Sequence, residues 1–321
     1  MGSRPVTVKF VDFWQSFDWQ DNRFVRALES QRQVTVLAPS SPEVPDILFY
    51  SRGPGCAHLR YDCVKVYFTG ENDFPDFNEC DYALSFYESD CGGRNLRYPL
   101  YMLYECEQAA NPPLLTDAEA LGRGFCSLVM SNASNCHPHR LEIIDAVAAY
   151  KPLAYGGAFR NNVGGRVAEK IPFVGRYKFN LALENSVMPG YVTEKLLEPF
   201  AAATVPVYWG AEAAKRDFNP EAFVNVNDYA TLDSLVAALR RLDNDPAAYL
   251  AMLRAPACVA DTVADHDTRL SEFLNAIADN PVRRISPYGE IHNLSLRNCV
   301  LVPLWHSRVG RAVARIVSRL V

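Results

Sequence analysis

The stretch YKFNLALENSVMPGYVTEKLLEPFAAATVPVYWG, from Tyr177 to Gly210, contains the clearest indications of fold and function in the chain. It begins with an apolar run, Phe179 to Leu183, which predicts a buried strand ending in the polar residues 184–186. A turn with proline and glycine follows, and Thr193 is placed to cap a helix. A second buried strand is predicted at Val205 to Trp209. Strand, helix and strand in this order predict a parallel α/β unit.

The start of the predicted helix is the part of this stretch that points to a ligand. Glu194 and Lys195 fall in its first turn, where a helix carries about half a positive charge and N–H groups without intrahelical partners. Such an end favours a bound phosphate, and a lysine reinforces that preference. In open α/β sheets, ligands bind at the carboxyl ends of the strands. The stretch therefore indicates a nucleotide or nucleotide-sugar site. An ordinary solvated helix start with a Glu–Lys pair is the alternative.

Alternating strands and helices extend on both sides of this stretch. In the first half, short apolar or β-branched runs predict strands at 6–13, 34–37, 47–50, 64–68 and 82–86. One segment of this half, 22–29, is predicted to be a helix. After a looser segment at 107–124, a second series has strands at 125–130, 153–155 and 223–226, and helices at 137–150 and 231–242. The pattern predicts two α/β halves with a cleft between them.

Composition and charge narrow the class of protein. The chain has 321 residues, enough for two domains, and is 49% hydrophobic and 21% charged, as expected of a globular protein. Its formal net charge of −5 argues against a nucleic-acid binder that relies on overall positive charge. The charge is uneven, because residues 1–290 hold 27 basic and 37 acidic groups, whereas residues 291–321 hold five arginines and no acidic residue.

The C-terminal segment has the pattern of a basic amphipathic helix. Arg308, Arg311, Arg315 and Arg319 recur at intervals of three and four residues. Apolar residues fill the opposite side, namely Val309, Val313, Ile316, Val317 and Leu320. This pattern is typical of a helix that binds an anionic membrane surface, and a helix packed on the protein's own core is the alternative. No apolar run reaches the roughly 18 to 20 residues of a membrane span.

The nine cysteines include no CxxC pair, and their number is odd. Their spacing does not fit a zinc site, and their parity does not fit a complete disulfide framework. The N-terminal run MGSRPVTVKFVDF has no apolar core of a signal peptide. Together these features predict reduced thiols in a cytoplasmic protein.

Three runs in the second half resemble the signature of the α-1,3/4-fucosyltransferases, glycosyltransferase family 10. They are FNLALENS, YVTEKL and VPVYWG, at 179–186, 191–196 and 205–210. The continuation FNPEAFVNVNDY at 218–229 is similar to the bacterial members of the family. Shorter upstream runs also match and occur in the same order, namely FTGEN at 68–72, LRYPLY at 96–101 and GFCSLVMSN at 124–132.

The resemblance implies a GT-B fold, in which two Rossmann-like domains face a cleft. We expect an acceptor-binding domain at 1–122, a GDP-fucose-binding domain at 123–290 and the basic tail at 291–321. The implied activity is inverting transfer of L-fucose from GDP-fucose to O3 of N-acetylglucosamine in N-acetyllactosamine-type or Lewis-type glycans. A GT-B transferase with another nucleotide sugar or acceptor is the alternative, as is a catalytically silent nucleotide-sugar or glycan-binding protein.

The resemblance implies a donor and an acceptor as partners, and the tail and the cysteines indicate a location. The expected partners are GDP-fucose, a β-galactoside or N-acetylglucosamine acceptor, and an anionic membrane surface contacted by the tail, with no nucleic acid. In a bacterium the activity would decorate lipopolysaccharide with Lewis-type structures. From the cysteines and the basic tail we expect a cytoplasmic protein bound peripherally at the inner face of the cytoplasmic membrane.

Three carboxylates are candidates for catalysis or for binding a substrate. Glu71, in FTGEN after a predicted strand, matches the base that removes the proton from the acceptor hydroxyl, and a loop carboxylate that caps a turn is the alternative. Glu88, in FYESD, is the rival base and otherwise orients the acceptor. Glu194 matches a donor-side position, where it binds a ribose hydroxyl or stabilises positive charge at the sugar ring.

Five residues match positions that hold the donor. Arg140 and Lys195 match residues that contact the phosphates, where positive charge stabilises the departing diphosphate. The alternative for Arg140 is a surface arginine. Asn185 and Tyr191 match other donor-binding positions. Glu184 either contacts the donor or is a structural carboxylate.

No metal ion is required for the implied activity, although Mg²⁺ or Mn²⁺ is left open as an activator. The two Asp-x-Asp triplets, at 243–245 and 265–267, fall at a predicted helix end and in a polar, helical stretch, not at a strand end. His137 and His139 resemble the start of a metal site, but no third ligand follows, which favours a solvated loop.

Overall fold

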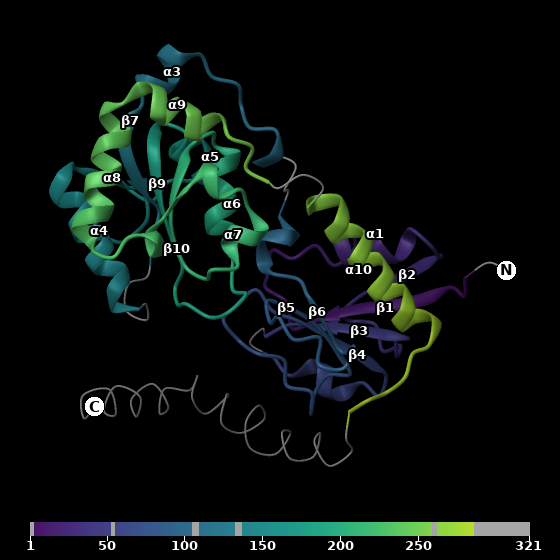
Figure 1. Ribbon diagram of the computed structural model, residues 1–321. Helices are drawn as coiled ribbons and strands as arrows, with labels where there is room; N and C mark the ends of the chain where they lie inside the picture. The colour runs from purple at the N-terminus through teal and green to yellow at the C-terminus, as the bar shows by residue number, and fades with distance from the viewer. Residues whose placement is uncertain (1–2, 53–54, 105–108, 132–136, 259–261, 286–321) are drawn as a thin grey trace, which may run out of the picture.

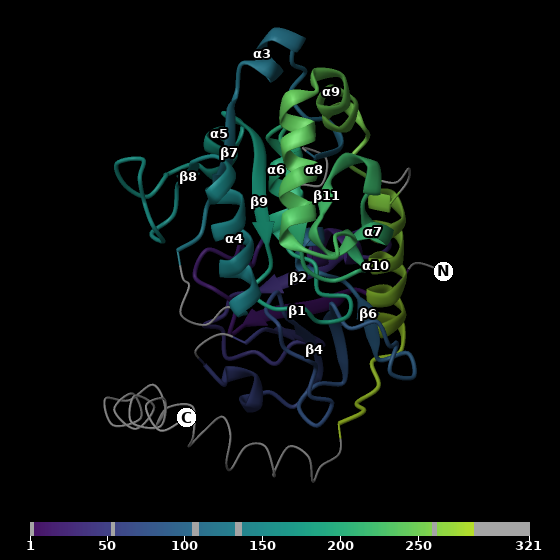
Figure 2. The same ribbon diagram turned by 60° about the vertical axis from the view of Figure 1, so that its left-hand side comes forward.

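The structure is a computed structural model, and it describes residues 3–52, 55–104, 109–131, 137–258 and 262–285 (Figure 1). The tail at 291–321 lies outside these ranges, so its amphipathic helix stays a prediction. The described chain forms two α/β halves, each built around a parallel sheet (Figures 1 and 2). The predicted fold class is therefore confirmed.

The first sheet has six parallel strands in the order β2-β1-β3-β4-β5-β6. They are β1 (Val6–Val11), β2 (Val34–Leu37), β3 (Ile47–Tyr50), β4 (Val64–Phe68), β5 (Tyr82–Ser85) and β6 (Asn95–Arg97). Five of them were predicted. The sixth is three residues long and mostly polar, so it has no local strand pattern, and it forms because β5 provides the hydrogen-bonding edge.

The second sheet has five parallel strands in the order β11-β10-β9-β7-β8. They are β7 (Gly124–Leu128), β8 (Leu153–Tyr155), β9 (Tyr177–Leu183), β10 (Val205–Trp209) and β11 (Val224–Asn225). The helices in this half are α3 (Asp117–Leu121), α4 (Pro138–Tyr150), α5 (Lys170–Val174), α6 (Glu194–Ala201), α7 (Ala214–Asp217), α8 (Leu232–Asn244) and α9 (Pro246–Arg254). As predicted, Thr193 caps α6, where its hydroxyl accepts from the Lys195 N–H.

The last described helix, α10 (Thr262–Asp279), crosses back to the first half and packs on α1 (Arg23–Glu29) (Figure 1). Its apolar residues Leu270, Leu274 and Ile277 join the core that includes α1. The region predicted as the second domain, 123–290, thus contains a helix that covers the first sheet. An amphipathic pattern shows that one face of a helix is buried, but not which sheet buries it.

The carboxyl ends of the two sheets meet at a packed interface. One hydrophobic core holds residues of both halves, including η2 (Leu100–Leu103) and α6. There the ring of Tyr101 lies 4.9 Å from that of Phe218. The loops that follow the strands of the two sheets are therefore held close together, which is where ligands of α/β proteins bind.

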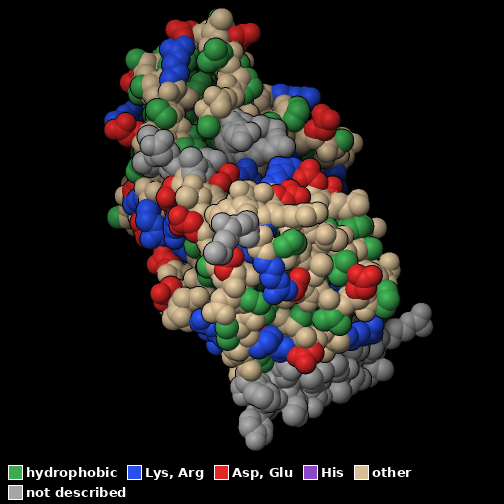
Figure 3. Space-filling model, turned by 90° about the vertical axis from the view of Figure 1, so that its right-hand side faces the viewer, with side chains coloured by type: hydrophobic (Ala, Val, Ile, Leu, Met, Phe, Trp, Pro, Cys, Tyr) green, Lys and Arg blue, Asp and Glu red, His purple; other side chains and the backbone are tan. Residues whose placement is uncertain are grey.

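The surface shown in Figure 3 carries acidic and basic side chains side by side, with hydrophobic side chains scattered among them. Among the helices that the structure describes, none combines the length and the apolar character needed to cross a membrane.

Candidate functional site

Glu184 connects the end of β9 to the start of α6. Its carboxylate is fully buried and accepts hydrogen bonds from the Thr193 N–H at 2.8 Å, the Thr193 hydroxyl at 2.9 Å and Lys195 Nζ at 3.2 Å. Burial raises the pKa of Glu184, while the charge of Lys195 and the Thr193 hydrogen bonds act in the opposite direction. Both carboxylate oxygens are thus used within the protein, and Glu184 orients the ammonium group of Lys195.

Lys195 lies between two carboxylates, because its Nζ is also 3.6 Å from Glu194 Oε1. Burial alone would lower the pKa of Lys195, but the charges of Glu184 and Glu194 outweigh burial and hold the pKa well above its ordinary value. Burial would raise the pKa of Glu194, but Lys195 and Lys170 lower it overall. Glu194 Oε2 is buried and has no hydrogen-bond partner among the described residues, so this oxygen can accept from a ligand.

Arg140 lies in the first turn of α4 and is only 3% exposed, so the alternative of a surface arginine does not hold. Its Nη1 donates to Asn185 Oδ1 at 2.9 Å, which joins α4 to the loop after β9. Asn185 is itself exposed. Arg140, Lys195 and Lys170 line one small hollow of about 10 Å³ at the carboxyl ends of β7 and β9, which has room for about one water molecule. Lys170 was not predicted as a site residue, because a single lysine outside any motif carries no local pattern.

Tyr191 belongs to the second half but packs against the first. Its side chain is buried, and its ring meets that of Phe86 edge to face at 5.2 Å. The preceding Gly190 has φ of +84°, and a Cβ there would lie 2.2 Å from the Phe86 carbonyl oxygen, so only glycine fits. Arg97 donates to the Gly190 carbonyl at 3.2 Å. The turn before α6 is therefore docked on the first half.

Glu71 is exposed in the loop after β4, where its N–H donates to the Thr69 hydroxyl at 3.1 Å. The adjacent Asn72 donates to the Ser186 hydroxyl of the loop after β9 at 2.5 Å. The predicted base therefore sits on a loop that contacts the loop following β9, the strand that leads to Glu184.

Two tyrosines lie within electrostatic reach of both Glu71 and Glu194. Burial raises the pKa of Tyr191, and the charges of Glu184, Glu71 and Glu194 add to the increase. Burial also raises the pKa of Tyr104 to about 12, with contributions from the charges of Glu194 and Glu71. Tyr104 is partly exposed and was not predicted as a site residue, because it lies beyond the LRYPLY run and only the fold brings it near α6.

Glu88 lies in the loop after β5 and is exposed. Arg216 of α7 pairs with its carboxylate at 2.9 Å. A Cβ at Gly190 would lie 3.0 Å from Glu88 Cγ, so Glu88 is part of the contact between the halves. Its role in orienting the acceptor stays a prediction.

Aspartates of both Asp-x-Asp triplets have structural partners. Asp243 pairs with Lys151 and Lys178, and Asp245 caps α9 by accepting from the Ala248 N–H. In the second triplet, Asp267 pairs with Arg23 at 2.8 Å. Within the part of the chain that the structure describes, no group of three His, Cys, Asp or Glu side chains is arranged to hold a metal ion.

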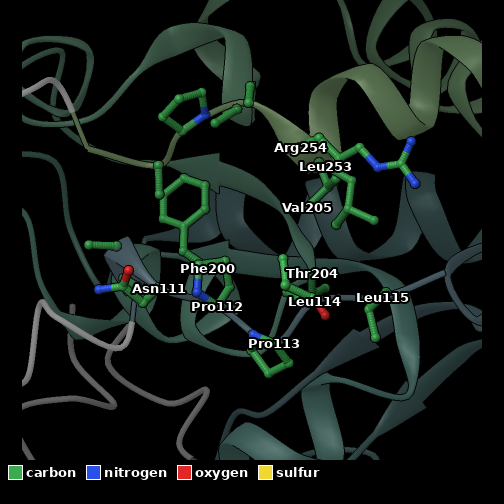
Figure 4. A pocket seen from close by; sticks show the side chains of 17 residues that line it. Asn111, Pro112, Pro113, Leu114, Leu115, Phe200, Thr204, Val205, Leu253 and Arg254 are labelled. Carbon is green, nitrogen blue, oxygen red and sulfur yellow. The ribbon is translucent and has the colours of Figure 1, made fainter. Parts of the chain in front are cut away.

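A larger cavity, of about 680 Å³, lies away from these residues, between the segment linking the halves and α6 and α9 (Figure 4). Its lining is mostly apolar and includes Pro112, Leu114, Phe200 and Leu253. None of the predicted site residues lines it.

Comparison with known proteins places both halves in one family. Residues 8–104 match the model of the alpha-(1,3)-fucosyltransferase FucT N-terminal domain, and residues 125–256 match the model of the C-terminal part of glycosyltransferase family 10 (fucosyltransferase). The second match ends before α10, which packs on the first half.

Curated relatives and solved structures agree with these models. The chain is 33% identical to the alpha-(1,3)-fucosyltransferase FucT of Helicobacter pylori over 286 residues, which cover 78% of this chain and 59% of that protein. It is 35% identical to a human 4-galactosyl-N-acetylglucosaminide 3-alpha-L-fucosyltransferase over 153 residues, covering 46% of this chain and 40% of that protein.

A crystal structure of an alpha1,3-fucosyltransferase with GDP-fucose superposes with a TM-score of 0.72 at 28% identity, covering 88% of this chain and 93% of that chain. The superposed region includes both α/β halves of this chain. The chain therefore belongs to glycosyltransferase family 10, the fucosyltransferases, and has the GT-B fold.

Proposed function

We propose that this chain is an inverting α-1,3-fucosyltransferase that transfers L-fucose from GDP-fucose to O3 of N-acetylglucosamine in N-acetyllactosamine-type glycans. One observation carries the proposal: the loop that holds Glu71 is hydrogen-bonded through Asn72 to Ser186 of the loop after β9, and the neighbouring Asn185 of that loop contacts Arg140. The relatives named α-1,3-fucosyltransferases and the solved structure with GDP-fucose support the choice of donor and linkage.

On the donor side, Arg140 and Lys195 hold the diphosphate. Their positive charge stabilises the GDP leaving group as the bond to fucose breaks, and the effect is strong because both side chains are largely buried. Asn185 and Tyr191 border the same region. Glu184 acts indirectly by fixing Lys195, since its own oxygens are already bonded.

On the acceptor side, Glu71 takes the proton of the attacking hydroxyl as that oxygen bonds to the anomeric carbon of fucose. Attack and departure occur on opposite faces, so a β-linked donor gives an α-linked product. Glu194 Oε2 is available for a ribose hydroxyl or for positive charge that develops at the fucose ring.

The direct test is incubation with GDP-fucose and N-acetyllactosamine, with and without a chelator. Glu71→Gln removes the base without changing its shape, and we expect turnover to fall by about 10²–10⁴-fold while the Kd for GDP is unchanged. Glu29→Gln is the matched control, because Glu29 is an exposed carboxylate of the same half at the end of α1, and this variant should keep the wild-type activity. Full activity in Glu71→Gln, or no transfer to any β-galactoside by a GDP-binding wild type, would refute the proposal.

We further propose a cytoplasmic location at the inner face of the cytoplasmic membrane, with lipopolysaccharide carrying Lewis-type structures as the product. The support is the five arginines and the absence of acidic residues in 291–321. Truncation after residue 290 should abolish binding to vesicles with anionic lipid and leave turnover of soluble acceptors intact. Equal vesicle binding by the truncated chain would contradict this location.

A further inference from the structure

Lys170 is the first residue of α5, which packs beside α6 (Figure 1). Its side chain lines the same small hollow as Arg140 and Lys195, at the carboxyl ends of β7 and β9. Three cations from three different elements thus border one hollow, although only Lys195 lies in one of the sequence runs that resemble the family.

The charge of Lys195 is largely compensated within the protein. Its Nζ lies 3.2 Å from Glu184 and 3.6 Å from Glu194, and both contacts involve buried or mostly buried groups. A diphosphate carries at least two negative charges, so Lys195 and Arg140 leave part of that charge without a cation. A further cation beside the hollow would supply it.

Glu198 explains how Lys170 is held in place. The two side chains form an ion pair, and they are 29% and 18% exposed, respectively. Glu198 lies one turn after Glu194 on α6, so the pair fastens α5 to the helix that carries Lys195. An ammonium group has three N–H donors, so Lys170 can keep Glu198 as a partner and donate to a phosphate oxygen at the same time.

We propose that Lys170 is a third cation that binds the diphosphate of the nucleotide donor at the mouth of this small hollow, and that Glu198 is the positioning residue that holds its ammonium group beside Arg140 and Lys195. The inference rests on the proposed function, because it takes a guanosine diphosphate as the ligand. It adds to that function a phosphate contact from α5, outside the motifs that identify the family.

The experiment compares GDP with guanosine, which lacks the phosphates. Lys170→Met alone would leave Glu198 without its cation, so the variant is made together with Glu198→Gln and compared with Glu198→Gln alone. Isothermal titration calorimetry should show the Kd for GDP about tenfold higher in K170M/E198Q than in E198Q, because one charge-assisted hydrogen bond is lost. The Kd for guanosine should be the same in both.

Lys178→Met is the matched control. Lys178 is also a half-buried, ion-paired lysine, but it contacts Asp243 at the opposite end of β9, and its loss should leave both dissociation constants unchanged. An unchanged Kd for GDP in K170M/E198Q, or an equal increase in the Kd for guanosine, would overturn the role of Lys170 and leave the proposed function standing. A wild-type chain that does not bind GDP would overturn the proposed function together with it.

Discussion

Replacement of Arg97 by methionine tests whether the two halves are locked together beside the site. Arg97, at the end of β6, donates to both carboxylate oxygens of Asp217 in α7, at 3.0 and 2.6 Å. The two side chains are 12% and 3% exposed. A third hydrogen bond joins Arg97 to the carbonyl of Gly190, directly before Tyr191.

The structure sets the size of the expected effect. Removal of one member of a buried ion pair costs about 3–5 kcal/mol, because the remaining charge stays buried. Arg216 Nε remains 3.7 Å from Asp217 Oδ1, so we expect the lower end, about 3 kcal/mol. At about 2–4 °C per kcal/mol, the midpoint of thermal unfolding should fall by about 6–12 °C.

Differential scanning calorimetry of Arg97→Met and of Arg97→Met/Asp217→Asn provides the assay. The double variant leaves no unpaired buried charge and should recover most of the lost midpoint. Because Arg97 also holds the Gly190 turn, the KM for GDP-fucose should remain raised in the double variant. A midpoint within about 1 °C of the wild type for Arg97→Met would refute the reasoning, as would equal losses in both variants.

Three further changes give equally specific outcomes. Gly190→Ala should lower the unfolding midpoint and the transfer rate together, because φ of +84° and the neighbouring carbonyl exclude a Cβ; an unchanged midpoint would contradict this. Lys195→Met should reduce kcat/KM by about a hundredfold or more in the GDP-fucose assay, and near-normal kinetics would argue against phosphate binding by Lys195. Burial would lower the pKa of His58, but its hydrogen bond to Asp12 and the nearby carboxylates raise that pKa overall. Protonated His58 therefore stabilises the fold below its unfolded pKa of about 6.5, and this stability is lost as pH rises through its folded pKa. Urea denaturation from pH 6 upward should show this decline in the wild type and not in His58→Gln, and the same decline in both would exclude His58 as its source.

Much of the secondary structure follows from local sequence. The strands at 34–37, 47–50, 64–68, 153–155 and 205–209 have the predicted bounds, because each is a short apolar run. The predicted strand at 223–226 is shorter, since Val226 begins a 3₁₀ turn, η4 (Val226–Asp228). These differences lie at element ends, where local patterns are weakest.

The residues of the candidate site also form two groups, those that could be placed from the sequence and those that could not. Glu194 and Lys195 could be placed at a helix start, and Glu71 after a strand, because each lies next to an apolar run or a cap that is visible in the sequence. Lys170 and Tyr104 could not be placed, since neither has a pattern of its own and each reaches the site only through the packing of α5 or η2 against α6.

Local patterning is thus sufficient for two parallel α/β series and for a capped helix start with Glu194 and Lys195 in its first turn, because strand burial and helix capping depend on residues close together in the chain. Tertiary structure decides that α10 covers the first sheet, that Arg97 reaches Asp217, and that three cations share one hollow. These contacts join residues far apart in the chain, so they form only when the helices and strands that carry them have packed together.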